Sequence, residues 1–82
     1  MKKSFRVLTE DLWVVELNGT AYDGMAALKA LEELSDMLFL RGLRWRVSTW
    51  SDQHVGVAVY IKVDQKTKEQ TLKEVSDFVN KE

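Results

Sequence analysis

The sequence predicts an α+β fold, a two-layer sandwich in which a four-stranded antiparallel sheet carries two helices on one face. Three observations lead to this prediction. Short runs of β-branched and aromatic residues come in pairs, a segment with helical apolar spacing follows each pair, and parts of this pattern recur about 40 residues apart. The predicted order is ββα-ββα, with βαββα as the alternative if the first strand region is one long bent strand.

The two halves of the chain resemble each other. FRVLT at residues 5–9 recurs as WRVST at residues 45–49, and LEELSDML at residues 31–38 recurs as LKEVSDFV at residues 72–79. Two matches at nearly one offset suggest a duplicated unit, with half-repeats at residues 3–42 and 43–82. Amphipathic helices and short strands can also resemble each other by shared pattern alone, so both explanations stay open.

The first strand pair is predicted at residues 4–9 and 12–17, which are rich in β-favouring residues. Glu10-Asp11 can form a tight turn between them. Asn18-Gly19 is then expected to turn the chain, and Thr20 with Asp23 resembles a helix N-cap arrangement.

A helix is predicted over residues 21–41, because its apolar residues recur at helical spacing. Arg41-Gly42 is a plausible stop, with a cation in the last turn and glycine just after it. Ala26, Ala30 and Met37 make the apolar arc wide, and we expect the second helix or another subunit to cover the excess. The inner face of this helix carries Ala27, Leu28, Leu31, Leu34 and Leu38.

The clearest hairpin is predicted at residues 44–50 and 55–63, joined by the polar connection Ser51-Asp52-Gln53-His54. A one-residue slip would turn all its β-branched positions outward, so its register is well specified. Thr67 followed by Gln70 then predicts a capping box for a last helix over residues 68–80. The inner face of that helix is expected to carry Leu72, Val75, Phe78 and Val79.

Alternation along the strands assigns each residue to one sheet face. The face beneath the helices receives Phe5, Val7, Trp13, Val15, Leu17, Trp45, Val47, Thr49, Val55, Val57, Val59, Ile61 and Val63. The opposite face receives Arg6, Leu8, Leu12, Val14, Glu16, Arg44, Arg46, Ser48, Trp50, Gly56, Ala58, Tyr60 and Lys62. This second set is unusual for open solvent, because it combines aliphatic, aromatic and cationic side chains.

Composition narrows the function classes. The 82 residues make one domain with no room for a second core. The chain has no cysteine and one histidine, so we expect neither a disulfide, nor a metal centre, nor another cofactor. Stability must then come from packing, from self-association or from a partner.

Charge argues against a global attraction to nucleic acid or lipid. Twelve basic residues oppose 13 acidic ones, for a net charge of −1. Met1-Lys2-Lys3 resembles the start of a secretory signal, but Glu10 and Asp11 arrive before an adequate apolar segment. No run approaches the ~18 apolar residues that span a bilayer. We therefore expect a cytoplasmic protein without a membrane partner.

Little in the sequence indicates catalysis. Ser51, Asp52 and His54 lie in one turn, whereas a triad needs its members held at set distances by different elements. Glu10-Asp11 is more typical of a solvated turn than of paired catalytic carboxylates. The segment at residues 18–24 matches neither phosphate-binding fingerprint. We expect the protein not to be an enzyme.

Three interpretations of the unusual face compete: scattered exposed apolar atoms without a role, a protein contact, and single-stranded nucleic-acid binding. The leading hypothesis is a protein-binding module (an adaptor, regulator or inhibitor) whose partner is another protein or a second copy in a homodimer. Nucleic acid is the alternative partner. The residues expected to make the contact are Arg6, Leu8, Val14, Arg44, Arg46, Trp50, Tyr60 and Lys62.

Overall fold

Two hairpins build the sheet. In the computed structural model, which describes residues 1–51 and 54–81 apart from the side chains of Ala21 and Ser51, β1 (Lys2–Thr9) pairs with β2 (Leu12–Thr20) around a turn at Glu10-Asp11. The second hairpin is formed by β3 (Arg44–Ser51) and β4 (His54–Lys62). Antiparallel pairing of β2 with β4 joins the hairpins into one sheet of order β1-β2-β4-β3. The ββα-ββα prediction is confirmed, and the alternative of one long first strand is wrong.

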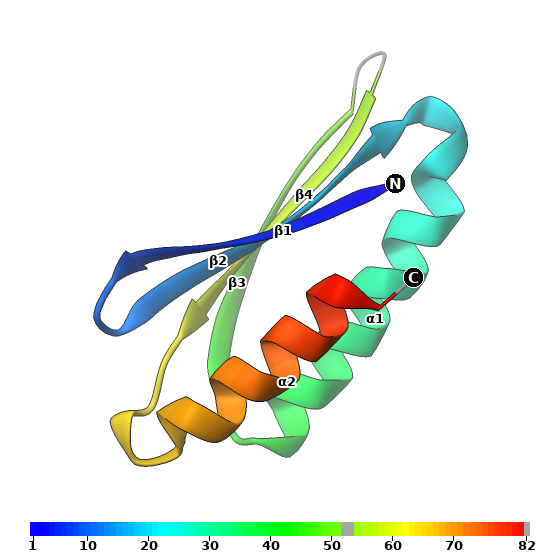
Figure 1. The fold of residues 1–82 in the computed structure, drawn as a ribbon. Helices are drawn as coiled ribbons and strands as arrows, with labels where there is room; N and C mark the ends of the chain where they lie inside the picture. Colours follow the sequence, from blue (N-terminus) through cyan, green and yellow to red (C-terminus); the bar gives the residue numbers. More distant parts are fainter. Residues whose placement is uncertain (52–53, 82) are drawn as a thin grey trace.

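Both helices lie on one side of this sheet (Figure 1). α1 (Gly24–Leu40) follows a short 3-10 turn and crosses from β2 to β3, which lie on either side of β4. α2 (Lys68–Asn80) follows β4. We call the sheet face beneath the helices the inner face and the opposite face the outer face.

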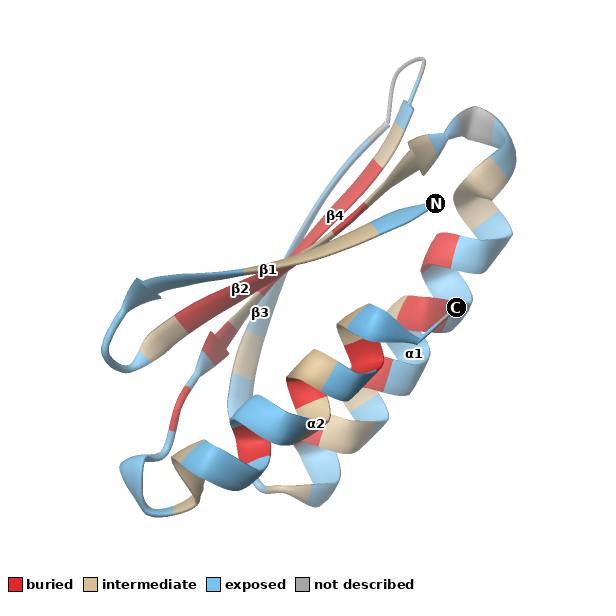
Figure 2. Ribbon diagram, in the orientation of Figure 1, coloured by how far each residue is buried: buried red, intermediate tan, exposed pale blue. Residues whose placement is uncertain are grey.

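The core lies between the inner face and the two helices. Alternate residues of β2 and β4 point into it, and the buried helix residues Leu34 and Val75 meet them with no exposed surface. Burial is accordingly concentrated in the two central strands (Figure 2). The core cluster comprises Val15, Leu17, Ala30, Leu34, Leu38, Leu43, Val57, Val59, Ile61, Val75 and Phe78.

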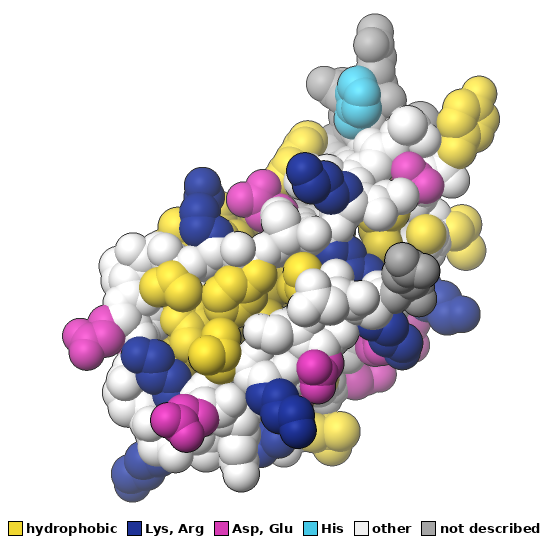
Figure 3. Space-filling view, viewed as in Figure 1, with side chains coloured by type: hydrophobic (Ala, Val, Ile, Leu, Met, Phe, Trp, Pro, Cys, Tyr) yellow, Lys and Arg dark blue, Asp and Glu magenta, His cyan; other side chains and the backbone are white. Residues whose placement is uncertain are grey.

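The helical layer is narrower than the sheet, and this corrects part of the predicted core. Val7 and Val47 pair with inner-face residues as expected, yet they remain 56% and 42% exposed because they lie on the edge strands. Leu28 and Leu72 were assigned to buried helix faces and are also exposed, while Thr71 is buried instead. An apolar patch is accordingly visible on the surface between β1 and α2 (Figure 3).

The connection after β2 differs from the prediction. Asn18-Gly19 does not turn the chain, because β2 continues to Thr20 and pairs there with His54. The turn comes instead at Ala21–Asp23, where the Thr20 backbone N–H donates a 2.8 Å hydrogen bond to Asp23 Oδ2. Gly19 allows this close approach, since a Cβ at that position would lie 2.5 Å from the same carboxylate oxygen.

The helix ends confirm one predicted signal and correct another. α1 ends as expected just before Gly42, whose φ of +69° permits the Schellman pair of hydrogen bonds from Gly42 and Leu43 back to the last turn. The capping box predicted for Thr67 and Gln70 does not form. The Asp64 side chain caps the preceding turn, and Gln70 accepts a hydrogen bond from Arg41.

The registers of the two hairpins differ. Phe5 pairs with Val15, ten residues along the chain, whereas its sequence counterpart Trp45 pairs with Ile61, sixteen residues along. The repeated strand segments therefore sit at different distances from their turns. A duplication stays a prediction, and it requires a longer second hairpin.

Candidate binding face

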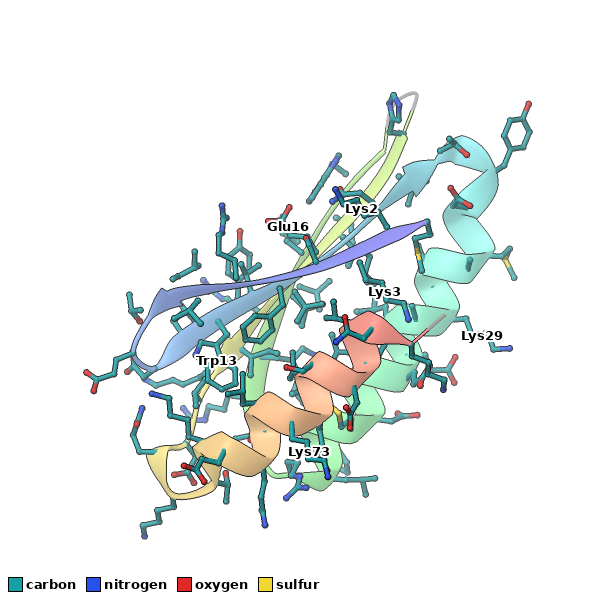
Figure 4. The ribbon with its side chains drawn as sticks, in the orientation of Figure 1. Lys2, Lys3, Trp13, Glu16, Lys29 and Lys73 are labelled. Atoms are coloured by element: carbon teal, nitrogen blue, oxygen red, sulfur yellow. The ribbon has the colours of Figure 1, made fainter. Side chains whose placement is uncertain are left out.

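The outer face is assembled as the strand alternation predicts. Across the sheet, Arg6 pairs with Val14, Val14 with Tyr60, and Tyr60 with Arg46. Figure 4 shows Lys2 and Glu16 on this side of the sheet, and Lys3 and Trp13 on the helix side. No helix covers the outer face in Figure 1, so its polar and aromatic side chains are accessible.

Small residues form the floor of this face. Val14 is only 1% exposed, and Gly56 and Ala58 are buried as well. Longer neighbours on the same face, Arg6 and Tyr60, flank Val14 on either side and shield it. The prediction that Val14 is an exposed contact residue is therefore wrong. It supports the face from below.

Trp50 lies flat on this floor. A Cβ on Gly56 would fall 1.8 Å from an indole carbon, so the ring occupies the space that a side chain at position 56 would fill. Trp50 and Gly56 are cross-strand partners, one on the edge strand β3 and the other on β4. The indole is still 44% exposed. One side of the ring therefore packs on Gly56, and the other side is exposed to solvent.

Two adjoining hollows open beside the Tyr60 side chain. One, of about 460 Å³, is lined by Leu12, Arg46, Val47, Ser48 and Tyr60. The other, of about 310 Å³ and almost entirely apolar, is lined by Leu12, Arg44, Trp45, Arg46, Tyr60 and Lys62. Leu12 lines both hollows, although it is absent from the predicted contact residues. Strand alternation already assigns Leu12 to the outer face, and this assignment could have identified it as a contact residue.

Charge on the outer face is strongly one-sided. The strand register places Lys2, Arg6, Arg44, Arg46 and Lys62 there against the single carboxylate of Glu16. Arg6 is engaged by that carboxylate at 3.5 Å. Leu8, also predicted on this face, lies at a register irregularity between Val7 and Thr9, where it is exposed but has no assigned pairing partner. A chain with net charge −1 thus presents a cationic face.

A further hollow lies on the helix side and is a less suitable site. It measures about 770 Å³ and lies between the start of β1, α1 and the end of α2. Two of its lysines are already engaged: Lys3 Nζ donates to the Phe78 and Lys81 carbonyls, and Lys81 Nζ donates to Glu33 at 2.9 Å. The Lys81 hydrogen bond lowers the pKa of the Glu33 carboxyl. These contacts hold the end of α2 against β1 and α1 and occupy two of the lysines that line the hollow.

Residues 1–51 and 54–81 contain no cluster of side chains arranged for catalysis or for metal binding. No cluster of His, Asp or Glu in that part of the chain could hold a metal ion. Asp52 and Gln53 of the polar connection lie outside the described residues. Two buried polar atoms of the described chain, Trp13 Nε1 and Thr71 Oγ1, have no hydrogen-bond partner. Neither lines a hollow reported above.

No family model matches the chain, and neither a curated protein nor a solved structure does. Within the described ranges no helix is long and apolar enough to cross a membrane. The geometry of the outer face is therefore the basis for a functional conclusion.

Proposed function

We propose that the protein is a non-enzymatic protein-binding module, an adaptor, regulator or inhibitor, and that its outer face binds a partner surface with an apolar centre and an acidic rim. One observation carries this proposal. The Trp50 ring, fixed on Gly56, lies on the same uncovered face as the hollows at Tyr60, and Arg44 and Arg46 line those hollows.

The residue types match those that dominate protein contacts. Tryptophan, tyrosine and arginine are enriched among the residues that contribute most of the binding free energy at interfaces. Tryptophan and tyrosine bury large areas with few rotatable bonds, and arginine adds charge-assisted hydrogen bonds. Holding the Trp50 indole on the sheet before binding reduces the conformational entropy lost on association. Arg44, Arg46 and Lys62 are exposed on the same face and favour an acidic partner.

The test is affinity capture from the native cell's lysate after nuclease treatment, followed by a direct titration of the recovered protein. We expect Trp50→Ala with Tyr60→Ala to weaken binding at least tenfold. Gly56→Ala should weaken it too, because the added methyl group displaces the indole without deleting it. Phe39→Ala removes an aromatic from α1 that is even more exposed than Trp50, and it should leave binding unchanged. Equal binding by all variants would reject the proposal.

A second candidate function is single-stranded nucleic-acid binding by the same face. It is favoured by the flat orientation of Trp50 on a face that also carries Arg44, Arg46 and Lys62, which suits base stacking combined with phosphate binding. It predicts that mixed DNA and RNA oligomers bind at low salt, and that affinity falls steeply with added salt and with Arg44→Ala or Arg46→Ala. An absence of binding at low salt would remove this candidate.

The compartment that fits the proposal is the cytoplasm. A chain without cysteine forms no disulfide that a reducing environment could break. Fluorescence microscopy of the tagged full chain in its native cell tests this placement.

A further inference from the structure

The edge of β3 is an open hydrogen-bonding edge. β3 pairs with β4 on one side only, and its register from Arg44 to Ser51 runs without interruption. The strand contains no proline and no lysine, and its charged side chains, Arg44 and Arg46, lie near its start. Every described side chain in it is exposed except Trp45, which is half-buried.

The other edge of the sheet is protected. β1 begins with Lys2 and Lys3 and has a register irregularity between Val7 and Thr9. Lysines and irregularities of this kind discourage strand addition. Of the two edges, β3 is the one suited to pair with another strand.

We propose that β3 pairs antiparallel with β3 of a second copy about a two-fold axis at Val47, so that one sheet runs through both molecules. This inference concerns self-association and does not depend on the proposed binding function. A two-fold contact is self-complementary, so the same strand supplies both sides.

The arginines select this register. With Val47 opposite Val47, Arg46 faces Ser48 of the second copy and Arg44 faces Trp50, so each cation lies opposite a neutral residue. Centring the pairing on Arg46 instead would oppose two guanidinium groups. Centring it on Ser48 would carry Arg44 beyond Ser51, where β3 ends. The Ser48 register also pairs seven residues, 45–51, but it leaves Arg44 without a partner, whereas the Val47 register places both arginines opposite neutral residues.

Apolar side chains beside the edge favour the same arrangement. On α1, Glu33 faces α2, because it binds Lys81. Helical spacing then turns the opposite flank of α1, with Leu28 and Leu31, toward β3. Leu28 is 60% exposed, and Val47 on the inner face is 42% exposed. A second copy at the β3 edge would cover this apolar strip together with the open backbone groups.

The pairing also bears on the outer face. The hollow lined by Arg46, Val47, Ser48 and Tyr60 lies at the β3 edge. Two copies related by the Val47 axis would bring their hollows side by side on one continuous surface. The helices of both copies would lie together on the opposite side.

Sedimentation equilibrium at micromolar to millimolar concentrations tests the proposal. The wild-type chain should give twice the mass of one chain. Val47→Lys places two ammonium groups on the axis and should halve that mass. Val7→Lys is the matched control, since Val7 occupies the equivalent inner-face position on the β1 edge and is even more exposed. It should leave the dimer intact.

Complementary charges test the register itself. Val47→Glu alone should also be monomeric, whereas an equimolar mixture of Val47→Lys and Val47→Glu should recover the dimer mass. Circular dichroism of each variant establishes that it is folded. Val47→Cys introduces the only thiol of the chain and should form a disulfide dimer rapidly on mild oxidation. Thr49→Cys lies opposite Trp45 of the second copy and should crosslink far more slowly.

A wild-type chain that sediments as a monomer throughout this range would overturn the proposal, and the edge would then be left for a strand of a different protein. A dimer that survives Val47→Lys but is lost in Trp50→Ala would overturn it as well. That result would indicate association through the outer faces.

Discussion

Two positions of this chain require glycine because a side chain there would clash with a neighbour, not because the backbone needs an unusual conformation. Gly19 lies under the Asp23 carboxylate, and Gly56 lies under the Trp50 ring. Neither has a positive φ, so the missing Cβ is what the structure uses in both places. Gly24, by contrast, has open space around its Cα and a helical backbone.

The contrast between two of these glycines gives a residue-scale prediction. Gly19→Ala should lower the free energy of unfolding by about 1–2 kcal/mol, because the new Cβ displaces the carboxylate that caps the Thr20 backbone N–H. Gly24→Ala should raise it by about 0.5–1 kcal/mol, since alanine fits a helix better than glycine. Urea unfolding of both variants measures the difference. Equal effects would contradict the proposed packing role of Gly19.

At this scale, the sequence predicted the direction of a side chain more accurately than its exposure to solvent. Period-two alternation correctly assigned Trp50, Tyr60 and Arg46 to the outer face. It did not predict that Val14 is buried there, because that depends on the length and position of side chains on two neighbouring strands. The sequence shows that Gly56 and Trp50 belong to the same face. That the two residues lie opposite each other can be known only once the pairing register of β3 and β4 is known.

Among the elements, the two helices are joined at one end by charge. Arg41 at the end of α1 forms a bidentate ion pair with Glu74 of α2, and its guanidinium also donates to Gln70. Arg41 lowers the pKa of the Glu74 carboxyl, chiefly through these hydrogen bonds. At the start of α1, the Thr20 backbone hydrogen bond lowers the pKa of Asp23 in the same way.

These shifts predict how stability depends on pH. A carboxyl whose pKa is lower in the folded state stabilises that state while it is ionised, and the contribution is lost as the pH falls through the folded pKa. Thermal unfolding should therefore shift to lower temperature below about pH 4.3. Glu74→Gln should lower the midpoint at neutral pH and weaken its acid dependence.

Glu32→Gln is the control for this prediction. Glu32 is an exposed carboxylate on α1 that makes none of these contacts. Its substitution should leave the pH profile unchanged. An equal effect of both substitutions would show that the Arg41–Glu74 pair does not contribute.

The existence of each element followed from the sequence, but some element boundaries did not. β2 runs three residues beyond its predicted end at residue 17, because β4 offers pairing partners as far as His54. That extension overrides the turn preference of Asn18-Gly19. The predicted cap of α2 failed for a similar reason, since Gln70 is bound by Arg41 from α1. Tertiary contacts decided both cases.

For the whole molecule, the core is shared between the two halves of the chain. Val15, Leu17 and Leu34 come from one half, and their partners in the core cluster include Val59 and Ile61 from the other. The central β2–β4 pairing also crosses between the halves. Neither half can therefore bury its apolar surface alone.

The shared core predicts cooperative folding. The full chain should unfold in one transition in urea, with the same midpoint by circular dichroism and by tryptophan fluorescence. Fragments of residues 1–42 and 43–82 should each be unfolded by circular dichroism, and mixing them should recover helical and strand signals. A fragment that folds by itself would contradict this account.

The contact between Trp50 and Gly56 links the evolution of two positions. A bulkier residue at position 56 has room only if position 50 loses its indole, and an unfilled hole would remain if position 50 shrank alone. Orthologues of this chain should consequently change the two positions together, exchanging a glycine–tryptophan combination for a pair of medium-sized side chains of comparable joint volume.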